Sequence, residues 1–84
     1  MQALAKAVVD ALAFLELSDD TTIDPDSAVQ AIEDLTATLR TASPAELQAV
    51  RDEATAALKR SEEELADPEV QAFYRDFMTN CGLA

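Results

Sequence analysis

The stretch that decides the fold runs from residue 24 to residue 46 and reads DPDSAVQAIEDLTATLRTASPAE. It contains the pairs Asp24-Pro25 and Ser43-Pro44, each followed by apolar residues at helical spacing. An aspartate or serine oxygen accepts a hydrogen bond from a free amide in the first helical turn, and proline at the first helical position removes no donor that the helix would use. Each pair therefore predicts a helix start. Glu46 completes a capping box with Ser43.

Working outward, Asp67-Pro68 predicts a third start of the same kind, and the polar run at residues 18–22 ends a helix at the beginning of the chain. The expected helices span about residues 2–17, 25–40, 44–65 and 68–81. Because only residues 41–43 separate the second and third helices, we expect these two to pack as an antiparallel hairpin. The sequence thus predicts an all-α protein, a small four-helix up-down bundle, with residues 1–84 as a single helical domain.

Apolar spacing assigns one face of each expected helix to the core. In chain order, the core stripes are Leu4, Val8, Leu12 and Leu15; Ala28, Ile32, Leu35 and Leu39; Leu47, Val50, Ala54, Leu58 and Leu65; and Val70, Phe73, Tyr74, Phe77, Met78 and Cys81. Gly82 and Leu83 are placed to close the last helix in a Schellman arrangement. Alanine supplies much of the 49% hydrophobic content, so we expect a thin core and a modest free energy of unfolding.

The chain has no histidine and a single cysteine, Cys81. A disulfide within the chain cannot form, zinc sites need clustered Cys or His ligands, and serine or thiol catalysis normally needs an imidazole base. The four aspartates at positions 19, 20, 24 and 26 do not match the ligand spacing of an EF-hand loop. We therefore expect no enzyme activity, no cofactor, and no catalytic, cofactor-binding or metal-binding residues.

Charge and hydropathy restrict the partners further. Six lysine and arginine residues against 17 aspartate and glutamate residues give a formal charge of −11 at pH 7, which repels polyanions. No apolar stretch reaches the length of a membrane span, and the first residues lack the basic opening of a signal peptide. We expect no nucleic acid partner, no membrane partner and a cytoplasmic location.

The first expected helix has more apolar surface than one core stripe requires. Val9, Phe14 and Leu17 fall outside that stripe, and only three charged residues occur in the whole segment. An almost wholly apolar helix is usually surrounded by other elements or covered by another chain. We therefore expect a protein that acts through protein–protein interaction, as a homodimer or by docking to another protein, with these three residues as contacts. Tyr74 and Met78, on one flank of the last helix, are further contact candidates.

The acidic surface supports an alternative interpretation, an inhibitor or immunity-type protein that binds a basic partner. The chain is similar in length and charge sign to the small acidic four-helix immunity proteins that neutralise bacterial toxins, although Tyr74 stands alone where that family has paired tyrosines ahead of a proline. The charges expected to contact such a partner lie on the second and third helices: Glu33, Asp34, Asp52 and Glu53.

A further alternative starts from Asp26-Ser27 at the beginning of the second expected helix. In a short acidic helical chain this dipeptide resembles the acyl carrier protein family, in which the serine bears a phosphopantetheine arm. The resemblance implies an acyl-carrier-like protein modified at Ser27. Pro25 and Ala28 depart from the family pattern, in which a glycine and a variable residue precede Asp-Ser and a leucine follows.

Overall fold

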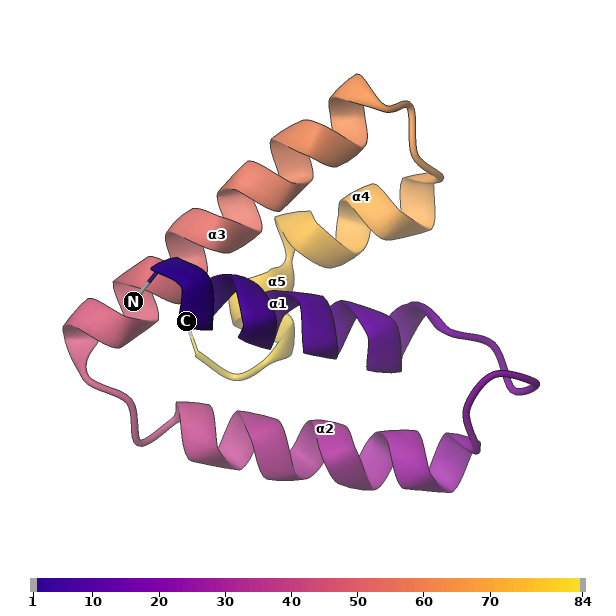
Figure 1. Ribbon diagram of the computed structural model, residues 1–84, viewed down its shortest axis with the longest axis horizontal. Coiled ribbons are helices and arrows are strands. Elements are labelled where there is room, and N and C mark those ends of the chain that lie inside the picture. Colours follow the sequence, from indigo (N-terminus) through magenta and orange to yellow (C-terminus); the bar gives the residue numbers. More distant parts are fainter. Residues whose placement is uncertain (1, 84) are drawn as a thin grey trace.

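The helices begin where the proline signals predict. The computed structural model describes residues 2–83, which form α1 (Gln2–Leu17), α2 (Pro25–Leu39), α3 (Pro44–Glu63), α4 (Pro68–Arg75) and α5 (Phe77–Asn80) (Figure 1). No β-strand occurs in this part of the chain. The prediction of a small all-α bundle is confirmed.

Two of the three expected caps form through side chains. The carboxylate of Asp24 accepts a hydrogen bond from the backbone N–H of Ser27 at 2.9 Å. At the start of α3, the Glu46 N–H donates to the Ser43 hydroxyl at 3.1 Å, and the Ser43 N–H donates to the Glu46 carboxylate at 2.9 Å, which is the predicted capping box. The side chain of Asp67 makes no capping bond at the start of α4, so that part of the expectation is wrong.

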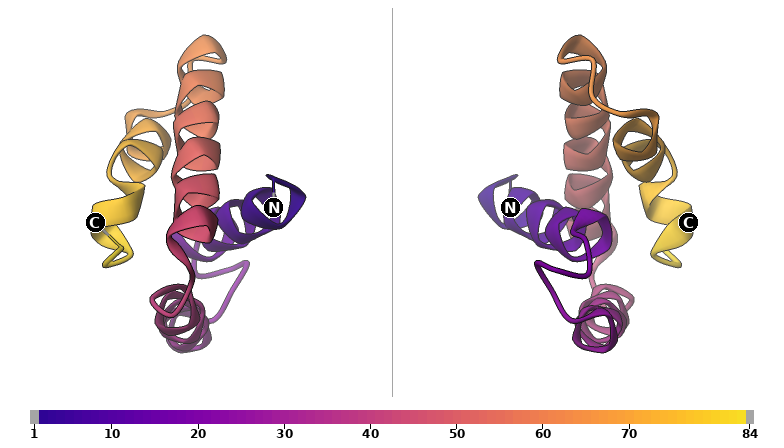
Figure 2. Two further views of the ribbon diagram at one scale, coloured as in Figure 1. Left: turned by 90° about the vertical axis from the view of Figure 1, so that its left-hand side faces the viewer. Right: turned by 90° about the vertical axis from the view of Figure 1, so that its right-hand side faces the viewer.

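The helices do not pair as the loop lengths suggest. The main packing contacts join α1 to α3, α3 to α4 and α1 to α2. In Figure 1, α2 runs back along α1, and α3 diverges from α2 after their short connection. The predicted hairpin of the second and third helices is therefore wrong. Figure 2 shows that α1 lies on the opposite side of α3 from α4 and α5.

The core lies between α1, α3 and the α4–α5 segment. Its most deeply buried large side chains are Val9, Leu12 and Phe77. The other members of this cluster are Ala5, Ala13, Val50, Ala54, Phe73, Met78 and Cys81. Three α2 side chains, Ile32, Leu35 and Leu39, pack against the cluster while remaining partly exposed. Alanines fill much of this core, as the composition predicted.

The buried face of α1 differs from the predicted one. The core residues of this helix are Ala5, Val9, Leu12 and Ala13, whereas Leu4 is 73% exposed and Leu15 is only partly buried. Both sets have helical spacing, so periodicity alone does not choose between them. The smaller set faces α3, whose buried residues include Ala54 and Ala57, and small side chains on both helices let their backbones approach closely.

The end of α3 also differs from the prediction. The helix ends at Glu63, and Leu65, expected in the core, is 86% exposed with a positive φ of 54°. The N–H of Ala66 donates to the Ser61 carbonyl at 2.9 Å, and that of Leu65 donates to the Glu62 carbonyl at 3.2 Å. This Schellman pattern places Leu65 at the position that glycine usually occupies.

Replacing Leu65 with glycine is expected to raise the free energy of unfolding by about 0.5–1 kcal/mol, because leucine is strained in the left-handed region and glycine is not. Urea denaturation followed by circular dichroism would measure the change. The matched control is Glu64→Gly, since Glu64 has an ordinary φ of −84° and should lose stability on the same substitution. A loss of stability in Leu65→Gly would show that the backbone of Leu65 is not strained.

The last expected helix is divided in two. Asp76, with φ −100° and ψ 12°, separates α4 from α5, although the prediction was one helix over residues 68–81. The aromatic face is nevertheless the buried one. The Phe73 ring meets the Phe77 ring edge to face, with 5.5 Å between centroids, and it meets the Tyr74 ring at 5.2 Å. The prediction that Phe73 and Phe77 belong to the core is confirmed.

The described chain closes in the predicted Schellman arrangement. Gly82 has a φ of 70°, and the N–H of Leu83 donates to the Met78 carbonyl at 2.8 Å. The guanidinium group of Arg40 lies against Gly82, where a Cβ atom would come within 3.3 Å of Nε. This contact connects the end of α2 to the turn that follows α5.

Candidate protein-binding surface

The three contact candidates predicted for α1 differ in their solvent exposure. Phe14 is 57% exposed, and Leu17 is partly buried against the core. Val9 is fully buried inside the chain, so its prediction as a partner contact is wrong. The physical reason is that α3 covers the face of α1 on which Val9 lies, while Phe14 lies on another side of the helix.

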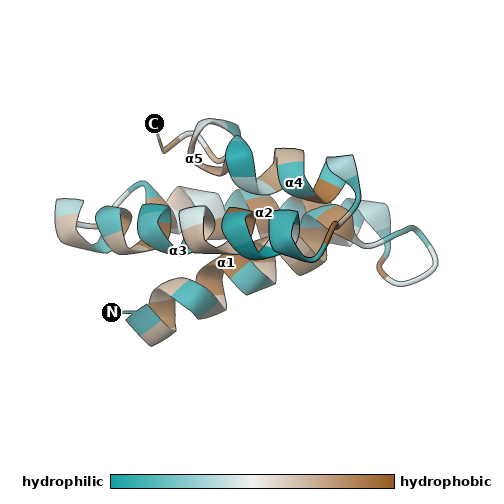
Figure 3. Cartoon of the chain, turned by 90° about the horizontal axis from the view of Figure 1, so that it is seen from above, coloured by the Kyte–Doolittle hydropathy of each residue, from teal (hydrophilic) through white to brown (hydrophobic). Residues whose placement is uncertain are grey.

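A second apolar face of α1 points away from the core. We call it the outer stripe and define it as the exposed residues Ala3, Leu4, Ala7, Ala11 and Phe14. At 3.6 residues per turn these five positions fall within an arc of about 100°, opposite the buried residues of the same helix. In Figure 3, tan and brown hydrophobic segments alternate with teal hydrophilic ones along α1. In Figure 2 this helix projects from the side of α3 that α4 and α5 leave open.

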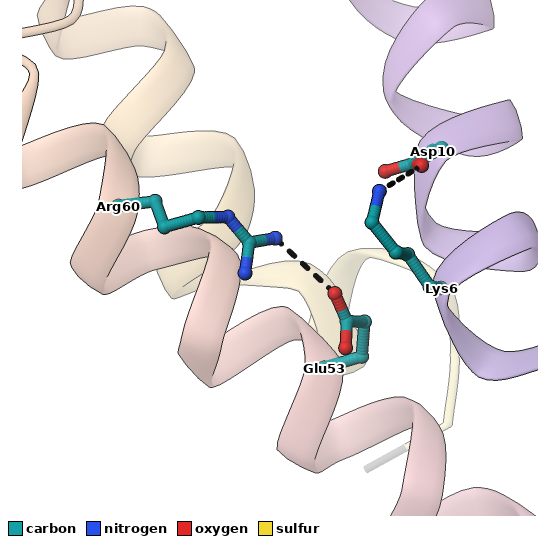
Figure 4. A network of polar contacts seen from close by, with 4 residues as sticks. All are labelled: Lys6, Asp10, Glu53 and Arg60. Atoms are coloured by element: carbon teal, nitrogen blue, oxygen red, sulfur yellow. Dashed lines mark hydrogen bonds and ion pairs between the residues drawn. The ribbon is translucent and has the colours of Figure 1, made fainter. Parts of the chain in front are cut away.

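The outer stripe is bordered by a balanced pair of charges. The Lys6 ammonium donates to the Asp10 carboxylate at 2.6 Å, one helical turn apart on α1 (Figure 4). Exposed pairs of this kind contribute little to stability. Their effect on the surface is larger, because they leave the outer stripe beside a locally neutral border in a chain of charge −11.

An open apolar pocket of about 90 Å³ adjoins Leu4, the residue at one end of the outer stripe. The residues that line it come from α1, the end of α2, the α2–α3 connection and the start of α3: Leu4, Ala5, Val8, Leu39, Ala42, Glu46, Ala49 and Val50. Glu46 is the one ionisable member, and its carboxylate belongs to the capping box with Ser43. The pocket therefore extends the apolar surface of α1 toward α2 and α3.

Hydrogen bonds from Ser43, chiefly from its backbone N–H, hold the pKa of Glu46 below the ordinary value for glutamate. A carboxyl whose pKa is lower in the folded state contributes stability at neutral pH, and that stability is lost as the pH falls through the folded pKa. Glu46→Gln keeps the capping geometry but removes the charge, so we expect it to lower the unfolding temperature at pH 7 and to match the original chain in strong acid.

The control for this prediction is Glu63→Gln at the other end of α3, which removes the same charge. A negative charge is favourable at a helix N-terminus and unfavourable at a C-terminus, so Glu63→Gln should raise the unfolding temperature at pH 7. Thermal unfolding of both variants at several pH values would measure the two changes. Equal changes at pH 7 would contradict a role for the position of the charge.

Two of the remaining predicted contacts are buried. Met78 is buried in the core, which makes its prediction as a partner contact wrong, and Tyr74 is partly buried with its ring against Phe73. Glu53 is also buried, and its carboxylate accepts a hydrogen bond from the Arg60 guanidinium at 3.2 Å (Figure 4). It does not belong to an open acidic face, and that part of the prediction is wrong as well.

The other predicted charges are exposed. Glu33 and Asp34 lie on α2, and Asp52 lies on α3. Asp34 accepts a hydrogen bond from the Gln30 amide at 3.0 Å, and Asp52 accepts one from the Gln48 amide at 2.8 Å. The two helices that carry these carboxylates diverge from their connection (Figure 1).

The groups considered for chemistry lie apart from the outer stripe. Ser27 is exposed in the first turn of α2, and Cys81 is a buried free thiol. Burial raises the pKa of Cys81, the negative charge of Glu16 adds to the rise, and Arg40 opposes it. Among residues 2–83, no three carboxylate or thiol side chains converge to form a metal site.

Comparison with known protein families, curated proteins and solved structures found no match to this chain. Within the described part of the chain, no helix is both long and apolar enough to cross a membrane. The functional interpretation therefore depends on the surface itself. Sequence reasoning found Phe14 but assigned Leu4 to the core and overlooked the three alanines between and beside them. The signal that could have identified them is the spacing of residues 4, 7, 11 and 14.

Proposed function

We propose that this chain is a non-catalytic binding protein that recognises a helical protein surface through the outer stripe of α1. The observation that carries the proposal is the large exposed apolar area of Leu4 and Phe14, on the side of α1 opposite to its buried face. Large apolar side chains on a shared exposed face are typical of interaction sites. Ala7 and Ala11, between them, would let a partner helix approach closely.

A reducing, cytoplasmic compartment fits this proposal. The chain has one cysteine and therefore no internal disulfide, and Cys81 is a free buried thiol. Small proteins of oxidising compartments commonly compensate for a thin core with disulfides.

The test is affinity capture from the native host with immobilised protein, followed by mass spectrometry. The original chain should retain a partner, which includes this protein itself, and Phe14→Asp should lose it. Val29→Asp is the matched control, because Val29 is 55% exposed on α2 and its replacement adds the same charge outside the outer stripe. Equal capture by Phe14→Asp and the original chain would refute the proposal.

A second candidate function is binding of a basic protein through exposed carboxylates. It is supported by the charge of −11 and by the ion pairs of residues 2–83, which neutralise only Asp10 and Glu53. Salt separates the two candidates, since apolar docking resists added salt and charge-driven docking weakens with it. Capture that disappears at high salt and is unaffected by Phe14→Asp would favour this second function.

A further inference from the structure

The outer stripe has the same spacing in either direction. Leu4, Ala7, Ala11 and Phe14 are separated by three, four and three residues, which is the spacing of a seam between two packed helices. When a second α1 lies antiparallel to the first, with the two-fold axis level with residue 9, Leu4 comes opposite Phe14 and Ala7 opposite Ala11. We propose that the outer stripe binds a second copy of this chain in this antiparallel arrangement, an inference that rests on the proposed function.

The side-chain sizes of the stripe are complementary in this arrangement. Phe14 of the second copy comes level with Leu4, beside Ala3 and Ala7, and all three of these residues are exposed in the single chain. The two alanines leave room for an aromatic ring next to the leucine. At the centre, Ala7 and Ala11 face their counterparts, so the helix axes can approach closely. A symmetric pair makes each such contact twice.

The charges that border the stripe are complementary as well. Lys6 and Asp10 lie on the same side of the stripe, close to the level of the two-fold axis. Antiparallel pairing places them along that side in the order Lys6, Asp10 of the second copy, Asp10, Lys6 of the second copy. Each lysine then lies about 3 Å along the helix axis from an aspartate of the other copy. The two aspartates are equally close to each other, so two attractive approaches stand against one repulsive approach. In a parallel pair the two borders would lie on opposite sides of the interface, so neither lysine would approach an aspartate of the other copy.

The size of the surface sets the strength of the dimer. The 16 residues of α1 span about 24 Å, and one face of such a helix offers less than the roughly 800 Å² per partner of a standard stable interface. We therefore expect a reversible dimer with a Kd between about 10 µM and 1 mM. Because each copy has a charge of −11, added salt screens the repulsion between copies and should tighten the dimer.

Sedimentation equilibrium of the full chain tests the proposal, at protein concentrations up to about 1 mM and at about 0.05 M and 0.5 M sodium chloride. Dimer should form and should tighten at the higher salt. Phe14→Asp should weaken association at least about tenfold, whereas the control Val29→Asp should stay within about twofold of the original chain. Circular dichroism would confirm that both variants fold, since both positions are exposed.

Orientation is tested by cross-linking with Ala7→Cys and Ala11→Cys, one of them labelled with ¹⁵N so that the products differ in mass. Antiparallel pairing predicts that the mixed disulfide exceeds both self-disulfides. The original chain is the control, because its Cys81 is buried and should not cross-link. A majority of self-disulfides would overturn the antiparallel arrangement.

The two proposals fail in different ways. A chain that stays monomeric at the highest concentration in both salts overturns the second-copy inference. If Phe14→Asp still abolishes capture of a host protein in that case, the outer stripe binds another helical protein and the proposed function stands. If Phe14→Asp changes neither measurement, both proposals are wrong.

Discussion

Replacing Phe77 with alanine is expected to lower the free energy of unfolding by about 3–5 kcal/mol, because Phe77 is 1% exposed at the centre of the core. A loss of that size is comparable with the whole stability expected of an 84-residue chain, so the variant should be largely unfolded near room temperature. Urea denaturation followed by circular dichroism would measure it.

The matched control for Phe77 is Phe14, which is the same residue type in the opposite environment. Phe14→Ala should change the free energy of unfolding by less than about 1 kcal/mol, since the ring already lies largely in solvent. Similar losses in the two variants would show that Phe14 is packed inside the chain, which would remove it from the outer stripe.

An aspartate on the buried face of α1 should strongly lower the free energy of unfolding, whereas an aspartate on the exposed face should change it little. Val9→Asp is expected to cost more than about 4 kcal/mol, because an unpaired carboxylate would replace a fully buried valine. Ala11→Asp, two residues later and on the exposed face, should cost less than about 1 kcal/mol, mainly through lower helix propensity. Far-ultraviolet circular dichroism and thermal unfolding would compare the two.

The substitution on the exposed face should affect self-association rather than folding. Ala11→Asp should remain helical and lose self-association, because the carboxylate would face the centre of the proposed dimer. A folded Val9→Asp variant would contradict the buried position of Val9. An Ala11→Asp variant that associates as strongly as the original chain would contradict the second-copy arrangement.

Local signals in the sequence determined what could be predicted. Capping residues such as Ser43 and Glu46 act within a few residues of themselves, so the starts of α2, α3 and α4 follow from short motifs. Gly82 likewise identified the final turn. The aromatic face of the last helix was also predictable, because Phe73 and Phe77 dominate its apolar surface whatever lies opposite.

Features that depend on distant residues could not be predicted in this way. Two faces of α1 have helical apolar spacing, and the face with the larger side chains was predicted to be buried. The face with Ala5 and Val9 is buried instead, because it packs against the alanines of α3. The burial of Glu53 depends on its pairing with Arg60 and on packing that the pattern does not reveal. The position of Leu65 follows from where α3 ends, two residues earlier than expected.

One apolar face of α1 lies in the core, and the proposed partner binds the other. The most direct measurement is an amide NMR titration of the ¹⁵N-labelled chain from about 20 µM to about 1 mM at high salt. We predict concentration-dependent shifts centred on Leu4, Ala7, Ala11 and Phe14, with none at Val29. Shifts centred on the carboxylates of α2 and α3, or no shifts anywhere, would contradict the account.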